Sequence, residues 1–116
     1  MLPESLNRVT IIGRLEREPE LRYTPSGRPV ACFCVATART WTDQGGASHE
    51  QTEWFNVVAW GELAEACKGG LVRSQRVYVE GRLQTRSWQD EHGRQCCRAE
   101  LVASQVIPVG DRAETS

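Results

Sequence analysis

The chain has 116 residues, 40% of them hydrophobic and 25% charged, with a formal net charge of −1, which is typical of one globular domain with its own core. No apolar run approaches the about 20 residues of a membrane-spanning helix, and the N-terminus lacks a signal-peptide pattern, so we expect a cytoplasmic protein. A net charge near zero argues by itself against a strong nucleic-acid binder, although acidic residues gather near the chain ends and leave a small basic excess between Ser5 and Arg98.

The first part of the chain predicts two long strands with a turn-rich stretch between them. Asn7–Leu15 alternates apolar and polar residues, and Gly13 within it indicates a bulge or a sharp bend. A short extended piece, Leu21–Thr24, leads into a turn at Pro25–Gly27. Pro29–Trp41 is then the second long strand.

A third strand, Trp54–Trp60, follows a flexible hairpin tip at Asp43–Ser48. Because side chains alternate along a strand, Trp54, Asn56, Val58 and Trp60 share one face. Six residues at about 3.3 Å each place the two indoles roughly 20 Å apart on that face.

The rest of the chain predicts one helix and two more strands. Helical spacing of Leu63, Ala66 and Cys67 predicts a helix over Glu62–Lys68, ended by Gly69 and Gly70. The remaining predicted elements are a strand at Arg76–Arg86, a hairpin at Ser87–Arg94 that carries Trp88, a strand at Gln95–Ile107, and a polar end from Pro108 onward.

Five strands with one short helix between the third and the fourth predict an all-β fold, an oligonucleotide-binding (OB) Greek-key barrel. We expect this domain to cover residues 1–108, followed by a short polar C-terminal end at 109–116. The ligand face and loops of such barrels commonly bind nucleic acid or sugar strands.

Four Trp against two Phe and two Tyr favour flat stacking surfaces, although core packing is the common use of any single Trp. All basic residues except Lys68 are Arg, which can grip a phosphate with two hydrogen bonds and stack on a base. Many arginines simply lie on solvated surfaces, so the pattern indicates nucleobase stacking and phosphate contact without proving either.

The five cysteines include no CxxC pair, so we expect reduced thiols and neither a metal site nor a cofactor. Cys32 and Cys34 lie within a predicted strand and share a face, whereas Cys96 and Cys97 are adjacent and point to opposite faces. Ser48-His49-Glu50 lies in a loop, but neighbours in sequence do not form a catalytic triad. We therefore do not expect an enzyme.

Several motifs, in order and nearly without gaps from about Asn7 to Ile107, resemble the bacterial single-stranded DNA-binding protein family. They are Ile12–Leu15, Pro19–Gly27, Thr52–Trp54, Val57–Glu65 and Val77–Trp88. The resemblance implies an OB fold, a homotetramer, and sequence-independent binding and protection of single-stranded DNA in DNA replication, recombination and repair. It also implies a location in the cytoplasm at the nucleoid.

The resemblance assigns DNA-binding roles residue by residue. Trp41, Trp54, Trp60 and Trp88 match its base-stacking aromatics, and Arg73 and Arg86 match basic positions along the DNA path. Glu62, Val72 and Gln84 stand where many relatives are basic. Among the arginines that compensate, we expect Arg39, Arg94 and Arg98 to contact DNA, while Arg76 and Arg82 could equally serve a subunit interface.

The same resemblance implies subunit contacts through the first strand and through packed sheets. We expect Asn7, Phe55, Tyr78, Glu80 and Arg82 at these interfaces, with Glu80 and Arg82 able to pair. Phe55 replaces a histidine found at the interface in some relatives.

Two further expectations concern partners. Relatives that recruit replication and repair proteins end in an acidic tip, which this sequence lacks, so we expect tail-dependent partners not to bind it. The alternative function is that of an OB-fold protein-interaction subunit, of the primosome-accessory type, which binds nucleic acid only weakly.

Overall fold

The computed structural model describes residues 4–110, so most of the polar end predicted for 109–116 lies outside the described residues. The elements in chain order are β1 (Val9–Leu15), β2 (Glu20–Tyr23), β3 (Pro29–Thr42), β4 (Ser48–Trp60), α1 (Glu62–Gly70), β5 (Arg76–Gln89) and β6 (Gln95–Pro108). Within the described range, no helix is long and apolar enough to cross a membrane.

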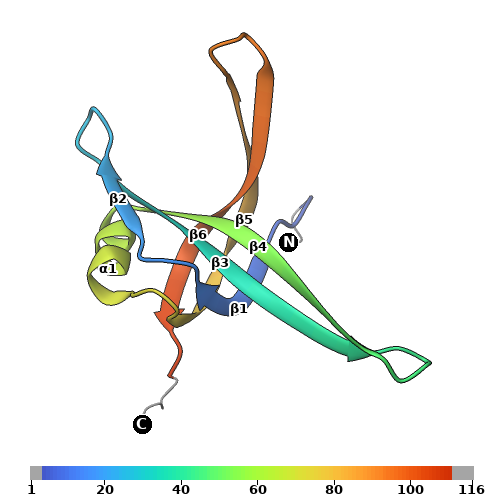
Figure 1. The fold of residues 1–116 in the computed structure, drawn as a ribbon. Helices are drawn as coiled ribbons and strands as arrows, with labels where there is room; N and C mark the ends of the chain where they lie inside the picture. Colours follow the sequence, from blue (N-terminus) through green and yellow to red (C-terminus); the bar gives the residue numbers. More distant parts are fainter. Residues whose placement is uncertain (1–3, 111–116) are drawn as a thin grey trace.

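The strands form one sheet in the order β1-β5-β6-β4-β3-β2, and β1 also pairs with β3, which closes the sheet into a barrel (Figure 1). The pairings are antiparallel except for the short parallel contact between β4 and β6. The predicted all-β barrel with one helix after its third long strand is thus confirmed. The short piece β2 adds a sixth strand at the edge of β3.

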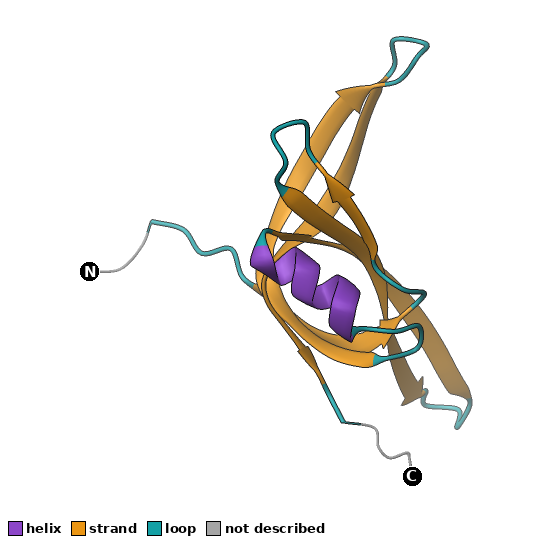
Figure 2. Ribbon diagram, turned by 90° about the vertical axis from the view of Figure 1, so that its left-hand side faces the viewer, coloured by secondary structure: helices purple, strands orange, loops and turns teal. Residues whose placement is uncertain are grey.

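The barrel is filled by apolar side chains from alternate positions of the long strands, and α1 lies across one end of it (Figure 2). The core strand residues are Leu15, Ala31, Phe33, Val35, Val57, Ala59, Val77, Val79 and Leu101. The helix buries Ala64 and Cys67, whereas Ala66 is exposed although it shares the helical spacing of Leu63 and Cys67. Positions 64 and 67 are three residues apart and lie on one side of a helix, while position 66 is turned away.

Two hairpin ribbons project from the barrel, one made by β3 and β4 and the other by β5 and β6 (Figure 1). We call them the β3–β4 arm and the β5–β6 arm. Their outer halves are exposed and have no core, yet their backbone pairing continues to Thr42↔Ser48 and Gln89↔Gln95. The strands are therefore longer than predicted: β4 begins six residues before Trp54, and Trp88 lies in a strand.

Gly13 lies where β1 turns from β5 to β3, pairing with Val77 just before Arg14 pairs with Ala36. A Cβ atom at Gly13 would lie 2.2 Å from the carbonyl oxygen of Ala36, so no other residue fits there without a backbone shift. β1 thus changes its partner strand at Gly13, the position at which the sequence predicts a bulge or a sharp bend. The sheet's register shift lies elsewhere, between Glu80 and Gly81.

Candidate nucleic-acid interface

An open cleft of about 610 Å³ lies on the outer face of the β3–β4 ribbon, where the ribbon leaves the barrel. It is bounded by the loop between β1 and β2, by β2 itself, and by Arg98 of β6. Its lining residues are Glu16, Arg17, Glu18, Pro19, Glu20, Leu21, Cys32, Phe33, Cys34, Asn56, Val57, Val58, Lys68 and Arg98. The cleft is thus lined by both acidic and basic side chains.

Two tryptophans flank this cleft along β4. Asn56 and Val58 line the cleft, and alternation places Trp54 before them and Trp60 after them on the same face. Trp54 is 56% exposed, and no ring or cation contact to it is recorded within residues 4–110. Trp60 is partly buried and has the Arg28 guanidinium 4.6 Å from its ring centroid. Trp54 is therefore the more exposed indole of the pair.

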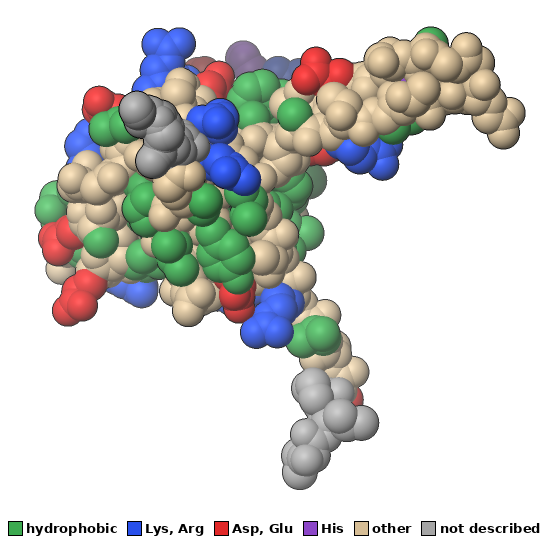
Figure 3. All heavy atoms as spheres, turned by 90° about the horizontal axis from the view of Figure 1, so that it is seen from below, with side chains coloured by type: hydrophobic (Ala, Val, Ile, Leu, Met, Phe, Trp, Pro, Cys, Tyr) green, Lys and Arg blue, Asp and Glu red, His purple; other side chains and the backbone are tan. Residues whose placement is uncertain are grey.

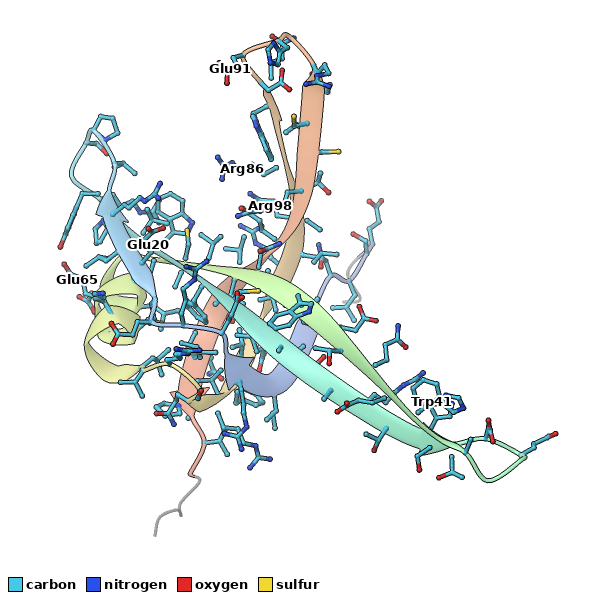
Figure 4. The ribbon with its side chains drawn as sticks, in the orientation of Figure 1. Glu20, Trp41, Glu65, Arg86, Glu91 and Arg98 are labelled. Atoms are coloured by element: carbon cyan, nitrogen blue, oxygen red, sulfur yellow. The ribbon has the colours of Figure 1, made fainter. Side chains whose placement is uncertain are left out.

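The β5–β6 arm contributes a third tryptophan, Trp88, and two arginines. Arg86 and Arg98 are direct cross-strand partners, and Trp88 follows Arg86 on the same face. The Arg86 guanidinium lies 5.2 Å from the centroid of the Trp88 ring. Figure 4 shows Arg86 and Arg98 on the side of this arm that looks toward β2, and Arg98 also lines the cleft.

Glu100 holds these two arginines at the base of the arm. It is only 5% exposed, the most buried charged residue recorded in the described range. One carboxylate oxygen lies 3.5 Å from Arg86 Nη1 and 3.7 Å from Arg98 Nη2. Like charges on facing positions repel, and the carboxylate between them offsets that repulsion. Both guanidinium groups remain about half exposed, which leaves N–H groups free to face a phosphate.

Trp41 lies apart from the cleft, near the tip of the β3–β4 arm (Figure 4). By alternation it belongs to the ribbon face of Phe33 and Val35, which the barrel no longer covers at this distance. The Arg39 guanidinium lies 4.6 Å from its ring centroid. Of the four tryptophans, three thus have an arginine over the ring.

Two further predicted DNA contacts, in addition to Trp41 and Arg39, lie away from the cleft. Arg94 lies at the tip of the β5–β6 arm, with its Nε 3.4 Å from a carboxylate oxygen of Asp90. Arg73 is exposed in the turn before β5 and is not among the cleft residues. Conversely, sequence reasoning missed Arg17, Arg28 and Glu100. Of these, only Glu100 had a signal, because it shares a strand face with Arg98, two residues earlier.

The predicted interface residues make contacts within the chain. The Asn7 side-chain amide donates to the Leu83 carbonyl at 2.7 Å and accepts from the Leu83 amide at 2.9 Å. Phe55 is partly buried and packs against the core. Both residues therefore already have structural roles in one subunit.

Within one subunit Glu80 has partners other than Arg82, and the pairing of these two residues between subunits stays a prediction. Glu80 pairs with Arg8 at 3.2 Å and accepts a hydrogen bond of 2.7 Å from the Tyr78 hydroxyl. That hydrogen bond is the main reason why the pKa of Tyr78 is raised. Arg82 donates to Gln84 at 2.8 Å.

All five cysteines are free thiols. Cys32 and Cys34 line the cleft, where burial, the larger cause, and nearby carboxylates raise the pKa of both thiols. A raised pKa leaves little reactive thiolate at neutral pH. Among the described residues, no group of three or more His, Cys, Asp or Glu side chains is placed to hold a metal ion.

Comparisons with known proteins give a consistent result. Residues 6–109 match the single-strand binding protein family. Proteins named single-stranded DNA-binding protein from two serogroups of Neisseria meningitidis are 43% identical over 112 residues, covering 97% of this chain and 64% of theirs. Single-stranded DNA-binding protein 1 of Chlorobaculum tepidum is 42% identical over 110 residues, covering 94% of this chain and 68% of its own.

A solved structure, described as a Plasmodium falciparum SSB complex with ssDNA, superposes with a TM-score of 0.85 at 28% identity. The superposition covers 95% of this chain and all of that one. This chain therefore spans a little under two thirds of the length of the Neisseria proteins and the whole of the solved domain.

Proposed function

The chain belongs to the single-strand binding protein family, and from that premise we propose that it binds and protects single-stranded DNA regardless of base sequence. The roles that we propose for it are in DNA replication, recombination and repair, in the cytoplasm at the nucleoid. The proposal is one of binding and not of catalysis.

The observation that carries this proposal is the placing of Trp54 and Trp60 at the two ends of one open cleft. Every base has a flat face that can stack on an indole, so a row of tryptophans holds a strand without reading its sequence. An unpaired strand exposes those faces, whereas a duplex hides them. Selectivity for single strands follows from this difference.

The arginines of the β5–β6 arm complement the stacking surfaces. Arg98 borders the cleft and Arg86 lies over Trp88, so phosphates between stacked bases would meet guanidinium groups. The β1–β2 side of the cleft is mixed in charge, because Glu16, Glu18 and Glu20 lie there with Arg17 and Lys68. The side of Arg98 carries two arginines, so we expect the strand backbone to run along it, with the bases turned toward β4.

The decisive experiment is a fluorescence-anisotropy titration with labelled oligo-dT at two salt concentrations, with a duplex of the same length as control. We expect tight binding of oligo-dT, weaker binding at higher salt, and much weaker binding of the duplex. Absence of oligo-dT binding would favour the alternative, a protein-interaction subunit with weak nucleic-acid affinity. Equal affinity for the duplex would contradict the stacking mechanism.

We also propose that the protein assembles as a homotetramer. On the outer face of the sheet, Ile12 pairs with Tyr78 and Tyr78 with Ile107, which makes a row across β1, β5 and β6. Ile12 and Ile107 are each about half exposed. Figure 3 shows hydrophobic side chains gathered on the underside of the barrel, where Figure 1 places β1. Exposed apolar patches of this kind mark interaction sites.

Light scattering at micromolar concentration tests the assembly, with a tetrameric mass as the expected result. The variant I12E places a charge in the centre of the apolar row and should lower the mass. A monomeric mass for the unmodified protein would refute the proposal.

A further inference from the structure

The tip of the β3–β4 arm holds four side chains in one connected group, which we call the tip cluster: Arg39, Trp41, Asp43 and His49. Trp41 and His49 are stacked, with ring centroids 5.3 Å apart and planes inclined by 22°. Arg39 lies over the Trp41 ring, and His49 Nε2 lies 2.7 Å from Asp43 Oδ2. His49 is thus fixed in position and orientation, although its side chain is 44% exposed.

Asp43 is itself held by the hairpin turn. Its Oδ1 atom accepts hydrogen bonds of 2.9 Å from the backbone amides of Gly45 and Ala47. The hydrogen bond from His49, followed by that from Ala47, lowers the pKa of the Asp43 carboxyl. Asp43 therefore stays ionised at any pH at which histidine changes its charge, and it acts as a fixed anion beside His49.

The second ring nitrogen of His49 has no recorded hydrogen bond within residues 4–110. With Nε2–H donating to Asp43, the neutral ring presents a lone pair at Nδ1, whereas the protonated ring presents an N–H donor there. Phosphate oxygens only accept hydrogen bonds. One protonation thus converts the free edge of the ring from a group that repels a phosphate into one that binds it.

The charges around His49 are few. Asp43 comes from the turn and Arg39 from β3, and on β4 itself Glu50 points to the other ribbon face. Glu53 shares the ribbon face of His49 but accepts a hydrogen bond of 3.0 Å from Gln51. His49 is therefore the imidazole of the tip cluster, with one carboxylate and one guanidinium as its charged neighbours there.

We propose that His49 is a further phosphate contact of this protein, one that forms only when the imidazole is protonated, so that the β3–β4 arm holds single-stranded DNA more tightly in mild acid. The proposal rests on the proposed function and adds to it a residue and a condition. No tryptophan or arginine of the cleft would give this dependence, because neither side chain titrates in this range.

A matched control for replacing His49 is available, because the other histidine of the chain, His92, lies at the tip of the β5–β6 arm. Asp90 organises that turn as Asp43 does the first, accepting 2.9 Å bonds from the amides of His92 and Arg94. Its second oxygen, however, faces Arg94 and not an imidazole. H92Q therefore changes a histidine in a similar turn without touching the tip cluster.

The test is the affinity for labelled oligo-dT at pH 6 and pH 8, at constant ionic strength, for the unmodified protein and for H49Q, H92Q and H49K. The unmodified protein and H92Q should bind about two- to fivefold more tightly at pH 6, the size expected of one exposed ionic contact. H49Q should show no such difference. H49K, charged at both values, should bind at pH 8 as tightly as the unmodified protein does at pH 6.

Three results would overturn the proposal: equal affinity at both pH values in the unmodified protein, a pH effect that survives in H49Q, or one that is lost in H92Q. If instead the proposed function were wrong, oligo-dT would bind at neither pH, which is a result distinct from these three. A salt titration adds a second readout. The slope of log K against log [salt] should be about 0.7 steeper at pH 6 than at pH 8, and only when His49 is present.

Discussion

Replacing Trp54 by alanine should lower the affinity for oligo-dT by about 20-fold. Trp54 is 56% exposed, which leaves open roughly 140 Å² of the about 250 Å² of a whole tryptophan side chain. A base stacked on one side of the ring covers about half of that area, or roughly 70 Å². At about 25 cal/mol per Å² this burial contributes ~1.8 kcal/mol, within the about 1–3 kcal/mol found for base stacking. At about 1.4 kcal/mol per tenfold, the loss corresponds to a factor of about 20.

Fluorescence anisotropy of a labelled oligo-dT measures this loss without using the tryptophan as the reporter. W54F is the matched control, because it keeps a flat ring at the same place and should lose much less affinity. Urea unfolding should give nearly the same midpoint for all three proteins, since the ring is largely exposed in the free protein. An affinity for W54A equal to that of the unmodified protein, with unchanged stability, would refute Trp54 as a stacking platform.

Three further outcomes are expected. R98A should weaken oligo-dT binding and reduce its salt slope by about 0.7, whereas R73A should change neither, because only Arg98 borders the cleft; equal effects would refute the strand path. In urea, G13A should lower the free energy of unfolding by about 1–3 kcal/mol or more because a Cβ there meets a backbone carbonyl, while G45A should not, because a Cβ there makes only an ordinary 3.5 Å contact with Asp43 Oδ1; equal stabilities would refute this crowding. Burial raises the pKa of Cys67 to about 11 from its ordinary value of 9.0, so folding stability should fall as pH rises above 9. The unfolded thiol ionises first, and C67A should lack that part of the loss; an identical alkaline profile would show that Cys67 is not the cause.

Much of the barrel could be predicted from the sequence. Each of its strands buries one face, so apolar and polar residues alternate along the strand. Val77 and Val79 or Phe33 and Val35 show this pattern in sequence, and all four are buried. The arms could not be delimited in the same way. Residues 48–53 are exposed on both faces, so no hydrophobic period marks them, and only their backbone pairing with β3 makes them a strand.

The candidate site could be predicted in part. Trp54 and Trp60 share a face because of strand alternation alone, and alternation was enough to place them. The burial of Glu100 depends on three segments at once: β5 brings Arg86, β6 brings Arg98, and the parallel pairing of Val57 with Leu101 presses β6 against β4. No local sequence pattern indicates that these three strands come together around Glu100. The stacking of His49 on Trp41 likewise requires the register of the hairpin, which a flexible polar tip does not reveal.

The closure of the barrel also has a consequence for the order in which the chain folds. Each arm is a hairpin of neighbouring segments, which can form as soon as it is synthesised. β1, in contrast, pairs through Thr10 with Glu80, and β4 pairs through Val57 with Leu101, so closure waits for late parts of the chain. Contacts between distant segments form slowly. During that delay the apolar face of β1 is uncovered, and stopped-flow refolding should show a closing phase that L101A slows and that exposed substitutions near the arm tips leave unchanged. In a nascent chain, the apolar face of β1 therefore stays uncovered until β6 has left the ribosome and the barrel can close.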